Sequence, residues 1–414
     1  MTVKIRVGFV MHKMQVAGAE VLVRQIIETL GDQIDATVIC LDAIGQIGHQ
    51  MIAAGHRVVC LDRRPGMDLS VARRLDRLVG RRGIEVLHAH QYTPFFYAAV
   101  ARLQHRTPVK IIFTEHGRHY PDVVSARRRW ANRLVLSRAA DVTTACCDFS
   151  THALRRVEGF AAAETLPNGI DIEAQPPRGD AAAVATRRQR LGLDPDRVYV
   201  ACVARMHPVK DHATLVRAWA TVHRQRPMAR LLLVGDGQLR SELERLVADL
   251  SGGDATLADS IQWWGVRDDV DQILRAVDVF ALTSVSEAAS LTLLEAMAAQ
   301  CAAVVTDVGG NAEHLRNNVD GYLVPRGDDR ALGDRLIDLI DDPRRRAAMG
   351  TTARQRVVTQ FQLSDAVDQY LGLYQRLAGR KPPAGRTPPA APKRPKTPAG
   401  SVGMRRNDTQ RLSA

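Results

Sequence analysis

The chain has 414 residues, of which 45% are hydrophobic and 25% are charged, and its formal net charge is +12. These proportions are ordinary for globular protein, and the length predicts two domains of 150–200 residues each. No run of 18 apolar residues occurs, so the sequence predicts no membrane-spanning helix. Lys4 and Arg6 interrupt the first apolar run, so we expect no signal peptide and a cytoplasmic location.

The positive charge is concentrated at the C-terminal end. From Arg380 onward the chain has nine lysines and arginines against one aspartate. Residues 379–414 are also rich in proline and alanine and poor in apolar residues, which predicts a disordered basic tail. The six cysteines show no C-x-x-C spacing, a pattern typical of small core residues in a reducing compartment.

The first half alternates apolar strands with helical stretches. Strands are expected at 4–11, 36–41, 57–61, 86–90 and 109–117. This alternation predicts a parallel sheet covered on both faces, and ligands of such sheets bind outside the carboxyl ends of the strands. The residues expected at or just beyond those ends are Gly18, His88, His90, Glu115 and His116.

A basic helix is expected over residues 125–140, where arginines surround Trp130. In the simpler interpretation, these arginines form the solvent-exposed face of the helix. The functional alternative is a surface that touches an anionic membrane or an anionic acceptor.

The second half repeats the alternating pattern. Residues 1–173 form the predicted first domain, and the polar segment 174–197 is interpreted as an interdomain linker. Strands near 198–204, 231–234, 261–264, 278–282, 302–306 and 321–324 predict a second doubly wound domain over 198–360. A last amphipathic helix within 361–378 is expected to pack back on the first domain.

Residues 283–313 have the strongest functional pattern. A buried strand leads into a polar loop with Glu287, and a helix that is apolar almost all round begins at about Ser290. Such a helix is normally buried, so its single charge, Glu295, needs a partner. The helix N-terminus offers free N–H groups and a positive dipole to an anion. Two acids bracketing such a site suit a nucleotide sugar, which has hydroxyl groups on both sides of a phosphate.

Basic residues occur at the same predicted sheet edge. Arg205 follows the first strand of the second domain, and Lys210 follows five residues later. Both can pair with a diphosphate, although a strand-end arginine is often structural. Gly235 lies in a tight strand-to-helix turn, and Gly309-Gly310 repeats the pattern of a glycine turn before a helix.

Two groups of residues, a histidine pair and three aspartate pairs, have side chains that can bind a metal ion. His88 and His90 are two residues apart on one strand, so both side chains should point to one face; zinc would need further ligands. The Asp pairs at 268–269, 328–329 and 341–342 fall at expected helix starts, where capping explains them. We therefore expect no metal. For His116, a structural and a catalytic role remain equally open at this point.

Over residues 3–375 the chain resembles retaining glycosyltransferases of family 4, which have the GT-B fold: two Rossmann-like domains facing each other across a cleft. The matching segments are Ala17-Gly18-Ala19-Glu20, His88-Ala89-His90, Thr114-Glu115-His116-Gly117, Pro167-Asn168-Gly169-Ile170-Asp171, Arg205 with Lys210, Val234-Gly235-Asp236-Gly237, Glu287-x7-Glu295 and Asp307-Val308-Gly309-Gly310-Asn311.

The resemblance implies transfer of a hexosyl group from a UDP- or GDP-sugar to a glycan or lipid-linked acceptor, without metal or cofactor and with front-face attack. It implies that the first domain binds the acceptor and the second the donor. It places Gly18, Arg205, Lys210, Gly235, Ser290, Leu291 and Glu295 at the donor, with Glu287 and His116 at the transferred sugar. His88, His90 and Glu115 would lie on the acceptor side.

Two departures from the family pattern affect the donor loop and the N-terminal motif. The family has Glu-Gly-x-Gly or Glu-Gly-x-Ser where this chain has Glu287-Ala288-Ala289-Ser290, and Ala17 replaces a glycine. We expect these departures to change the shape of the loop after Glu287 and therefore to affect which sugar the protein binds.

Alternative functions are a nucleotide-sugar epimerase or phosphorylase with the same fold, or polyanion binding by the tail. The tail lacks interleaved aromatic residues, so we expect no nucleic-acid partner, and weak attraction to an acidic membrane is favoured instead.

Overall fold

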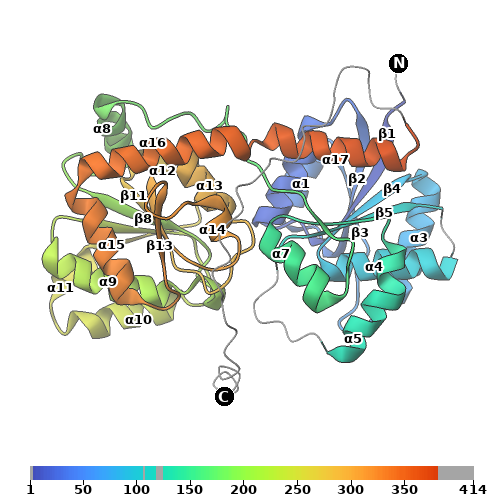
Figure 1. The fold of residues 1–414 in the computed structure, drawn as a ribbon, viewed down its shortest axis with the longest axis horizontal. Coiled ribbons are helices and arrows are strands. Elements are labelled where there is room, and N and C mark those ends of the chain that lie inside the picture. The colour runs from blue at the N-terminus through green and yellow to red at the C-terminus, as the bar shows by residue number, and fades with distance from the viewer. Residues whose placement is uncertain (1–2, 106–107, 118–124, 381–414) are drawn as a thin grey trace.

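The structure is a computed structural model that describes residues 3–105, 108–117 and 125–380. It contains two α/β domains side by side, joined by chain crossings in the middle of the molecule (Figure 1). Every strand pair in both sheets is parallel. The expected fold class, two doubly wound parallel sheets, is therefore confirmed. Residues 381–414 of the predicted tail lie outside the described residues.

The N-terminal sheet has seven strands in the order β3-β2-β1-β4-β5-β6-β7. They are β1 (Ile5–Lys13), β2 (Ile34–Ala43), β3 (Arg57–Cys60), β4 (Val86–His90), β5 (Lys110–Glu115), β6 (Val142–Ala145) and β7 (Glu164–Thr165). The five expected strands are all present. The sequence analysis missed β6 and β7, because segments of four and two residues are too short to show a periodicity.

The helices of the N-terminal domain include α1 (Gly18–Thr29), α2 (Gly45–Ala53), α3 (Ser70–Arg82), α4 (Tyr92–His105) and α7 (Asp148–Ala153). The apolar face of α1 packs against one face of the sheet, and that of α3 and α4 against the other, in two separate buried clusters. The sheet is thus covered on both faces, as a parallel sheet requires.

The C-terminal sheet has six strands in the order β10-β9-β8-β11-β12-β13. They are β8 (Tyr199–Val203), β9 (Arg230–Val234), β10 (Ile261–Gly265), β11 (Val279–Leu282), β12 (Ala302–Thr306) and β13 (Gly321–Val324), and all six were expected. The covering helices include α9 (His212–Gln225), α10 (Arg240–Ser251), α12 (Val270–Ala276), α13 (Leu291–Ala298), α15 (Asp329–Asp341) and α16 (Pro343–Gln360).

The strand order reverses between β1 and β4 in the first sheet and between β8 and β11 in the second. Loops diverge at these switch points, and doubly wound sheets bind their ligands there. The loop after β1 leads to Gly18, and the loops after β8 and β11 carry Arg205, Lys210 and Glu287. Topology therefore places most of the predicted donor residues at two switch points.

The segment 174–197 is more ordered than a plain linker. It contains α8 (Ala181–Arg190), which begins because the Asp180 side chain accepts the N–H of Ala183 at 2.8 Å and an alanine-rich run follows. Leu193 is buried in the core of the C-terminal domain. The second half of this segment is therefore part of that domain.

The last helix, α17 (Leu363–Leu377), lies against the N-terminal domain, after α16 has crossed from the C-terminal domain (Figure 1). Tyr370 and Tyr374 are fully buried in the cluster beneath β1. The two chain segments that cross between the domains, near Ile170 and near Leu363, lie side by side: the N–H of Leu363 donates to the carbonyl of Ile170 at 2.9 Å. A side chain at Gly169 would overlap the carbonyl of Gln362, which explains the glycine in this motif.

The expected basic helix is present as α5 (Ala126–Ala131), a π-helical turn (Asn132–Leu136) and α6 (Ser137–Ala139). The first residue of the π-helical turn, Asn132, is buried: its side chain donates to the carbonyl of Glu158 at 3.0 Å and accepts the Tyr92 hydroxyl at 2.7 Å. Trp130 is 69% exposed. No helix among the described residues is both long and apolar enough to cross a membrane.

The Asp pairs at 268–269, 328–329 and 341–342 were predicted to cap helix starts, and this is right for two of the three pairs. Asp328 accepts the N–H of Ala331, and Asp342 that of Arg345. It is wrong for Asp269, whose carboxylate pairs with the guanidinium of Arg267 at 2.6 Å. No cluster of three or more candidate metal ligands occurs within the described ranges.

Candidate active site

The loops after β8 and β11 meet at an ion pair. The Lys210 ammonium donates to the Glu287 carboxylate, which also accepts the Ser284 hydroxyl at 2.5 Å. Both side chains are largely buried, with 20% of Lys210 and 10% of Glu287 exposed. Thr283 fixes the lysine loop by donating its hydroxyl to the carbonyl of Lys210 at 3.1 Å. Two predicted site residues from separate loops therefore form one unit.

Two helix N-termini from different domains face each other beside this pair. Helix α1 begins at Gly18 and α13 begins at Leu291. A methyl group added at Gly18 would lie 3.5 Å from Cδ1 of Leu291, so the two helix starts are in near contact. Ser290 caps α13 by accepting the N–H of Leu293 at 3.3 Å. Two helix N-termini therefore lie close together, and helix N-termini attract anions.

Arg205 adds a cation at the same edge. Its side chain is exposed at the end of β8. Glu20, in the first turn of α1, is buried, and burial raises the pKa of its carboxyl while the charges of Arg205 and Lys13 oppose that rise. Glu20 is not among the predicted site residues, although it follows Gly18 by two residues. Its proximity to Arg205 links the two domains electrostatically.

Glycines shape the backbone behind the site. A side chain at Gly235 would overlap the carbonyl of Ala204, which precedes Arg205, and Gly235 has a φ of 128°. Side chains at Gly309 and Gly310 would overlap the carbonyls of Glu287 and Ala288. Gly310 also donates its N–H to the carbonyl of Glu287 at 3.1 Å. These glycines therefore let the backbone behind Arg205 and behind Glu287 and Ala288 approach closely.

Ala288, which stands where the family has a glycine, lies against the N-terminal domain. A β-carbon at Gly117, in the N-terminal domain, would lie only 2.5 Å from the methyl group of Ala288. Ala288 also packs with buried Cys146 and Cys147 of that domain. The methyl group that replaces the family's glycine is therefore accommodated at the interface between the domains.

His116 lies at the end of β5, against His90. Its Nε2 is 2.7 Å from Nδ1 of His90, and the rings stack with centroids 5.0 Å apart. Burial lowers the pKa of His116 to about 4 and that of His90 well below its usual value. Both rings are thus neutral at pH 7, and one of the two facing nitrogens donates its N–H to the other. Nδ1 of His116 and Nε2 of His90 are buried and have no hydrogen-bond partner among the described residues.

His88 and Glu115 are tied into the protein interior. His88 lies 4.0 Å from His90, ring centroid to centroid, so the expectation that both point to one face is confirmed. Nδ1 of His88 is 2.8 Å from the Tyr374 hydroxyl, and Nε2 is 2.7 Å from the Thr114 hydroxyl. Glu115 is buried and accepts the N–H of Gly117 at 3.2 Å. These contacts position the His90–His116 pair and the Gly117 turn.

Glu295 lies on α13, one turn beyond its start. Burial raises the pKa of its carboxyl to about 7, and the charge of Asp271 adds to the rise. By its exposed surface the residue is half-buried. A carboxyl group whose pKa is raised this far is a candidate for a functional site.

One contact between the domains was missed by the sequence analysis. The Glu313 carboxylate accepts the N–H groups of Asp148 at 2.8 Å and Phe149 at 2.7 Å, at the start of α7. Glu313 follows Gly309-Gly310 closely in the chain, so this contact holds the glycine loop against the N-terminal domain. The motif Gly-Gly-Asn-x-Glu was visible in the sequence, but its partner, a pair of backbone amides, has no sequence signal.

The site is thus a contact region between two Rossmann-like domains, with two helix N-termini and two cations suited to a diphosphate. This arrangement is that of GT-B glycosyltransferases.

Comparisons with known proteins agree with this class. Residues 16–174 match the family model Glycosyltransferase Family 4, and residues 184–356 match Glycosyl transferases group 1. The chain is 30% identical over 308 residues to a GDP-mannose-dependent alpha-(1-6)-phosphatidylinositol monomannoside mannosyltransferase of Mycolicibacterium smegmatis, covering 71% of this chain and 77% of the relative. It is 28% identical over 316 residues to N-acetyl-alpha-D-glucosaminyl L-malate synthase of Bacillus anthracis, covering 75% and 79%.

Among solved structures, HepE of Anabaena in complex with UDP and glucose superimposes with a TM-score of 0.78 at 20% identity, covering 90% of this chain and 100% of HepE. WaaG, a glycosyltransferase involved in lipopolysaccharide biosynthesis, gives 0.69 at 15% identity, covering 89% and 99%. The chain belongs to family 4 of the glycosyltransferases.

Proposed function

We propose that this glycosyltransferase moves a hexosyl group from a UDP- or GDP-sugar to a glycan or lipid-linked acceptor, with retention at the anomeric carbon and without cofactor or metal. The observation that carries the proposal is the near contact of Gly18 with Leu291, where α1 and α13 begin. Arg205 and Lys210 lie beside these helix starts. The relatives named for GDP-mannose and the UDP complex of HepE support a nucleotide-sugar donor.

The chemistry depends on charge that develops on the leaving diphosphate. Arg205, Lys210 and the first N–H groups of α1 and α13 would stabilise that charge, which would make a metal unnecessary. A donor phosphate that draws Lys210 away would release the Glu287 carboxylate to bind sugar hydroxyl groups. Glu295 would hold the ribose, and Gly235 would shape the turn beneath Arg205. In front-face attack, a phosphate oxygen of the donor accepts the proton of the acceptor hydroxyl.

The acceptor would enter from the N-terminal domain. Nδ1 of His116 would contact the transferred sugar, with His90 behind it and with His88 and Glu115 as supports. A lipid-linked acceptor would place the arginine-rich segment 126–139, with exposed Trp130, at an anionic surface. We therefore include peripheral contact with the inner face of a cytoplasmic membrane in the proposal. Participation in polysaccharide or glycoconjugate synthesis follows from the acceptor class.

The test begins with a screen of nucleotide sugars for thermal stabilisation of the full chain, followed by assays of transfer and donor hydrolysis. Lys210→Ala and Glu287→Gln should each lower transfer by at least about 100-fold, because each removes a charge that acts in the transition state. Lys4→Ala, a lysine at the opposite end of β1, is the matched control and should retain activity. Unchanged turnover in both site variants would refute the proposal. Incubation with donor alone separates an epimerase, which would yield an isomer of the donor.

A further inference from the structure

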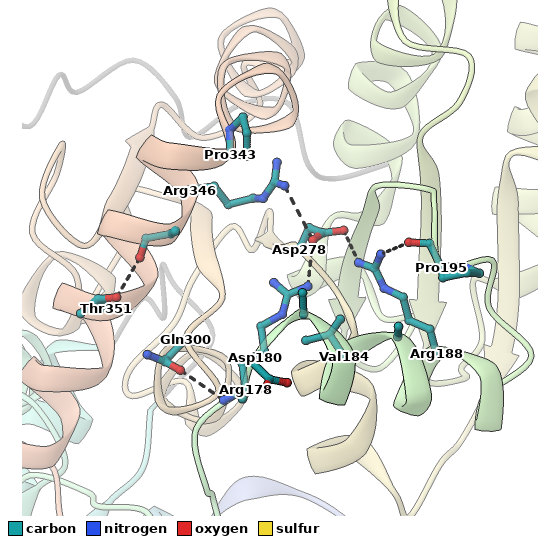
Figure 2. A pocket seen from close by; sticks show the side chains of 14 residues that line it. Arg178, Asp180, Val184, Arg188, Pro195, Asp278, Gln300, Pro343, Arg346 and Thr351 are labelled. Atoms are coloured by element: carbon teal, nitrogen blue, oxygen red, sulfur yellow. Dashed lines mark hydrogen bonds and ion pairs between the residues drawn. The ribbon is translucent and has the colours of Figure 1, made fainter.

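A second polar cavity lies in the C-terminal domain, away from the candidate active site. Its volume is about 440 Å³, which falls within the range of small-molecule sites. The side chains around it include Arg178, Arg188, Arg346 and Asp278 (Figure 2). We call it the Arg178–Arg346 cavity. Asp278 precedes β11 and Gln300 follows α13, whereas the active-site loop follows β11 and precedes α13. The cavity therefore lies at the opposite ends of these two elements.

The acceptor atoms of the Asp278 carboxylate are already occupied. One oxygen accepts from Arg178 at 2.8 Å and has Arg346 at 3.8 Å. The other accepts from Arg188 at 2.6 Å and from the N–H of Tyr199 at 2.9 Å. The second lining acid, Asp180, caps α8 by accepting the N–H of Ala183 at 2.8 Å. Both oxygens of Asp278, the buried acid of the cavity, are thus already used by its present donors.

The arginines, by contrast, have donors to spare. Arg188 uses four of its five N–H donors, on Asp278 and on the carbonyls of Ala276, Pro195 and Arg197. Arg178 donates through Nη2 to Asp278, but its Nε and Nη1 make no hydrogen bond to a described residue. Arg346 donates through Nη1 to the carbonyls of Leu339 and Ile340, and its Nε and Nη2 likewise make none. Only 17% of the Arg178 side chain and 15% of the Arg346 side chain are exposed.

Positive charge is therefore crowded into a partly buried space. Burial lowers the pKa of Arg346, and the nearby charges of Arg178 and Arg188 lower it further against the opposing effect of Asp278. The N-termini of α8 and α16 also border the cavity, through Ala181 and Pro343, and add their positive dipole ends. An anion bound between Arg178 and Arg346 would satisfy the spare donors and offset this repulsion.

We propose that the Arg178–Arg346 cavity is a second ligand site, which binds a phosphate group as the free ion or as a sugar phosphate. The guanidinium groups of Arg178 and Arg346 supply the donors, and planar guanidinium groups bind phosphate oxygens in pairs. The volume beyond these two side chains leaves room for the sugar of a monoester. This site is separate from the proposed donor site, and its test does not depend on any transfer activity.

The experiment is calorimetric titration of the full chain with inorganic phosphate and, separately, with glucose 1-phosphate, at constant ionic strength set with sodium chloride. Arg346→Gln should weaken binding at least about tenfold, and Arg178→Gln with Arg346→Gln should abolish it, because each change removes charge-assisted hydrogen bonds. Lys210→Ala, which alters the active site, should retain this binding. Tighter binding of inorganic phosphate would identify the free ion, and tighter binding of glucose 1-phosphate the monoester.

A further variant tests the proposal without removing an arginine, because the arginine variants could lose binding simply by failing to fold. Ala347 is exposed on α16 and lines the cavity, so Ala347→Glu introduces a carboxylate without removing any existing contact. It should abolish phosphate binding and raise the midpoint of thermal unfolding, because the new carboxylate takes the place of the anion. The proposal is overturned if Ala347→Glu or the double arginine variant binds phosphate as the wild type does. It is equally overturned if Lys210→Ala alone removes all binding, or if the wild type binds neither probe.

Discussion

The carboxylate of Glu313, in the C-terminal domain, accepts the backbone N–H of Asp148, in the N-terminal domain, at 2.8 Å, and the next N–H, that of Phe149, at 2.7 Å. An acid from one domain thereby caps a helix of the other. The cap is placed three residues after Gly310, whose N–H bonds the carbonyl of Glu287. The contact between the domains and the loop that carries Glu287 are therefore connected through one short segment.

Removing this cap should weaken donor binding more than turnover. Glu313→Ala leaves two amides of α7 without their acceptor and frees the glycine loop, so KM for the donor should rise about 3- to 10-fold with a smaller change in kcat. Steady-state kinetics with the donor found by the screen measure both constants. Glu313→Gln, which keeps an acceptor oxygen without the charge, should be intermediate. Wild-type kinetics in Glu313→Ala would show that the cap does not support the donor loop.

The close approach of Gly117 to Ala288 predicts a sensitive position. Gly117→Ala places a methyl group 2.5 Å from that of Ala288 and forces a side chain onto a residue with a φ of 114°. We expect a loss of about 1–3 kcal/mol in the free energy of unfolding, together with reduced activity. Urea denaturation measures the first quantity. The double variant with Ala288→Gly removes the steric overlap but not the backbone strain, so it should recover only part of the loss. Full recovery would mean that the strain contributes nothing.

The charge of Glu295 should lower the free energy of unfolding above pH 4.5 and, at the same time, contribute to donor affinity. Burial raises the pKa of its carboxyl from 4.5 to about 7, so the folded protein disfavours the charged form, and its contribution becomes unfavourable as the pH rises from 4.5 to 7. Glu295→Gln removes the charge and should stabilise the fold at pH 8 by about 1–3 kcal/mol, with little effect at pH 4.5. Donor affinity, measured by calorimetry, should fall at least about tenfold. Unchanged affinity would exclude the proposed ribose contact.

The buried histidines predict a loss of stability in mild acid. The unfolded chain takes up protons at its histidines near pH 6.5, whereas burial lowers the pKa of His116 to about 4 and those of His88 and His90 well below 6.5. The free energy of unfolding should therefore fall as the pH decreases from 6.5 toward 4, by up to about 1.4 kcal/mol per pH unit for each histidine. Urea denaturation at several pH values measures this slope.

His116→Asn should reduce that slope by about one proton, because it removes one group that titrates only in the unfolded chain. His49→Asn, at an exposed position on α2, is the matched control and should leave the slope unchanged. Equal slopes in the wild type and in His116→Asn would show that His116 is protonated in the folded protein over this range.

The strand and helix pattern was readable from the sequence because both sheets are parallel and buried on both faces. Runs such as Tyr199–Val203 and Ala302–Thr306 are wholly buried, so each appears as a continuous apolar segment bounded by polar turns. The order of elements also fixed which loops lie at carboxyl ends of strands, and so Gly18, Arg205 and Glu287 could be selected. Segments without such a pattern, namely β6, β7 and α8, were not predicted.

The sequence by itself thus determined the two sheets, the residue types at their edges and the family. Only the tertiary structure decided which of those residues meet: Lys210 with Glu287, His116 with His90, and Gly117 with Ala288. It also revealed partners that have no sequence signal, such as the backbone amides capped by Glu313 and the spare donors around Asp278. The physical reason is that strand periodicity is a local property, whereas pairing across a cleft depends on how loops from distant parts of the chain pack together.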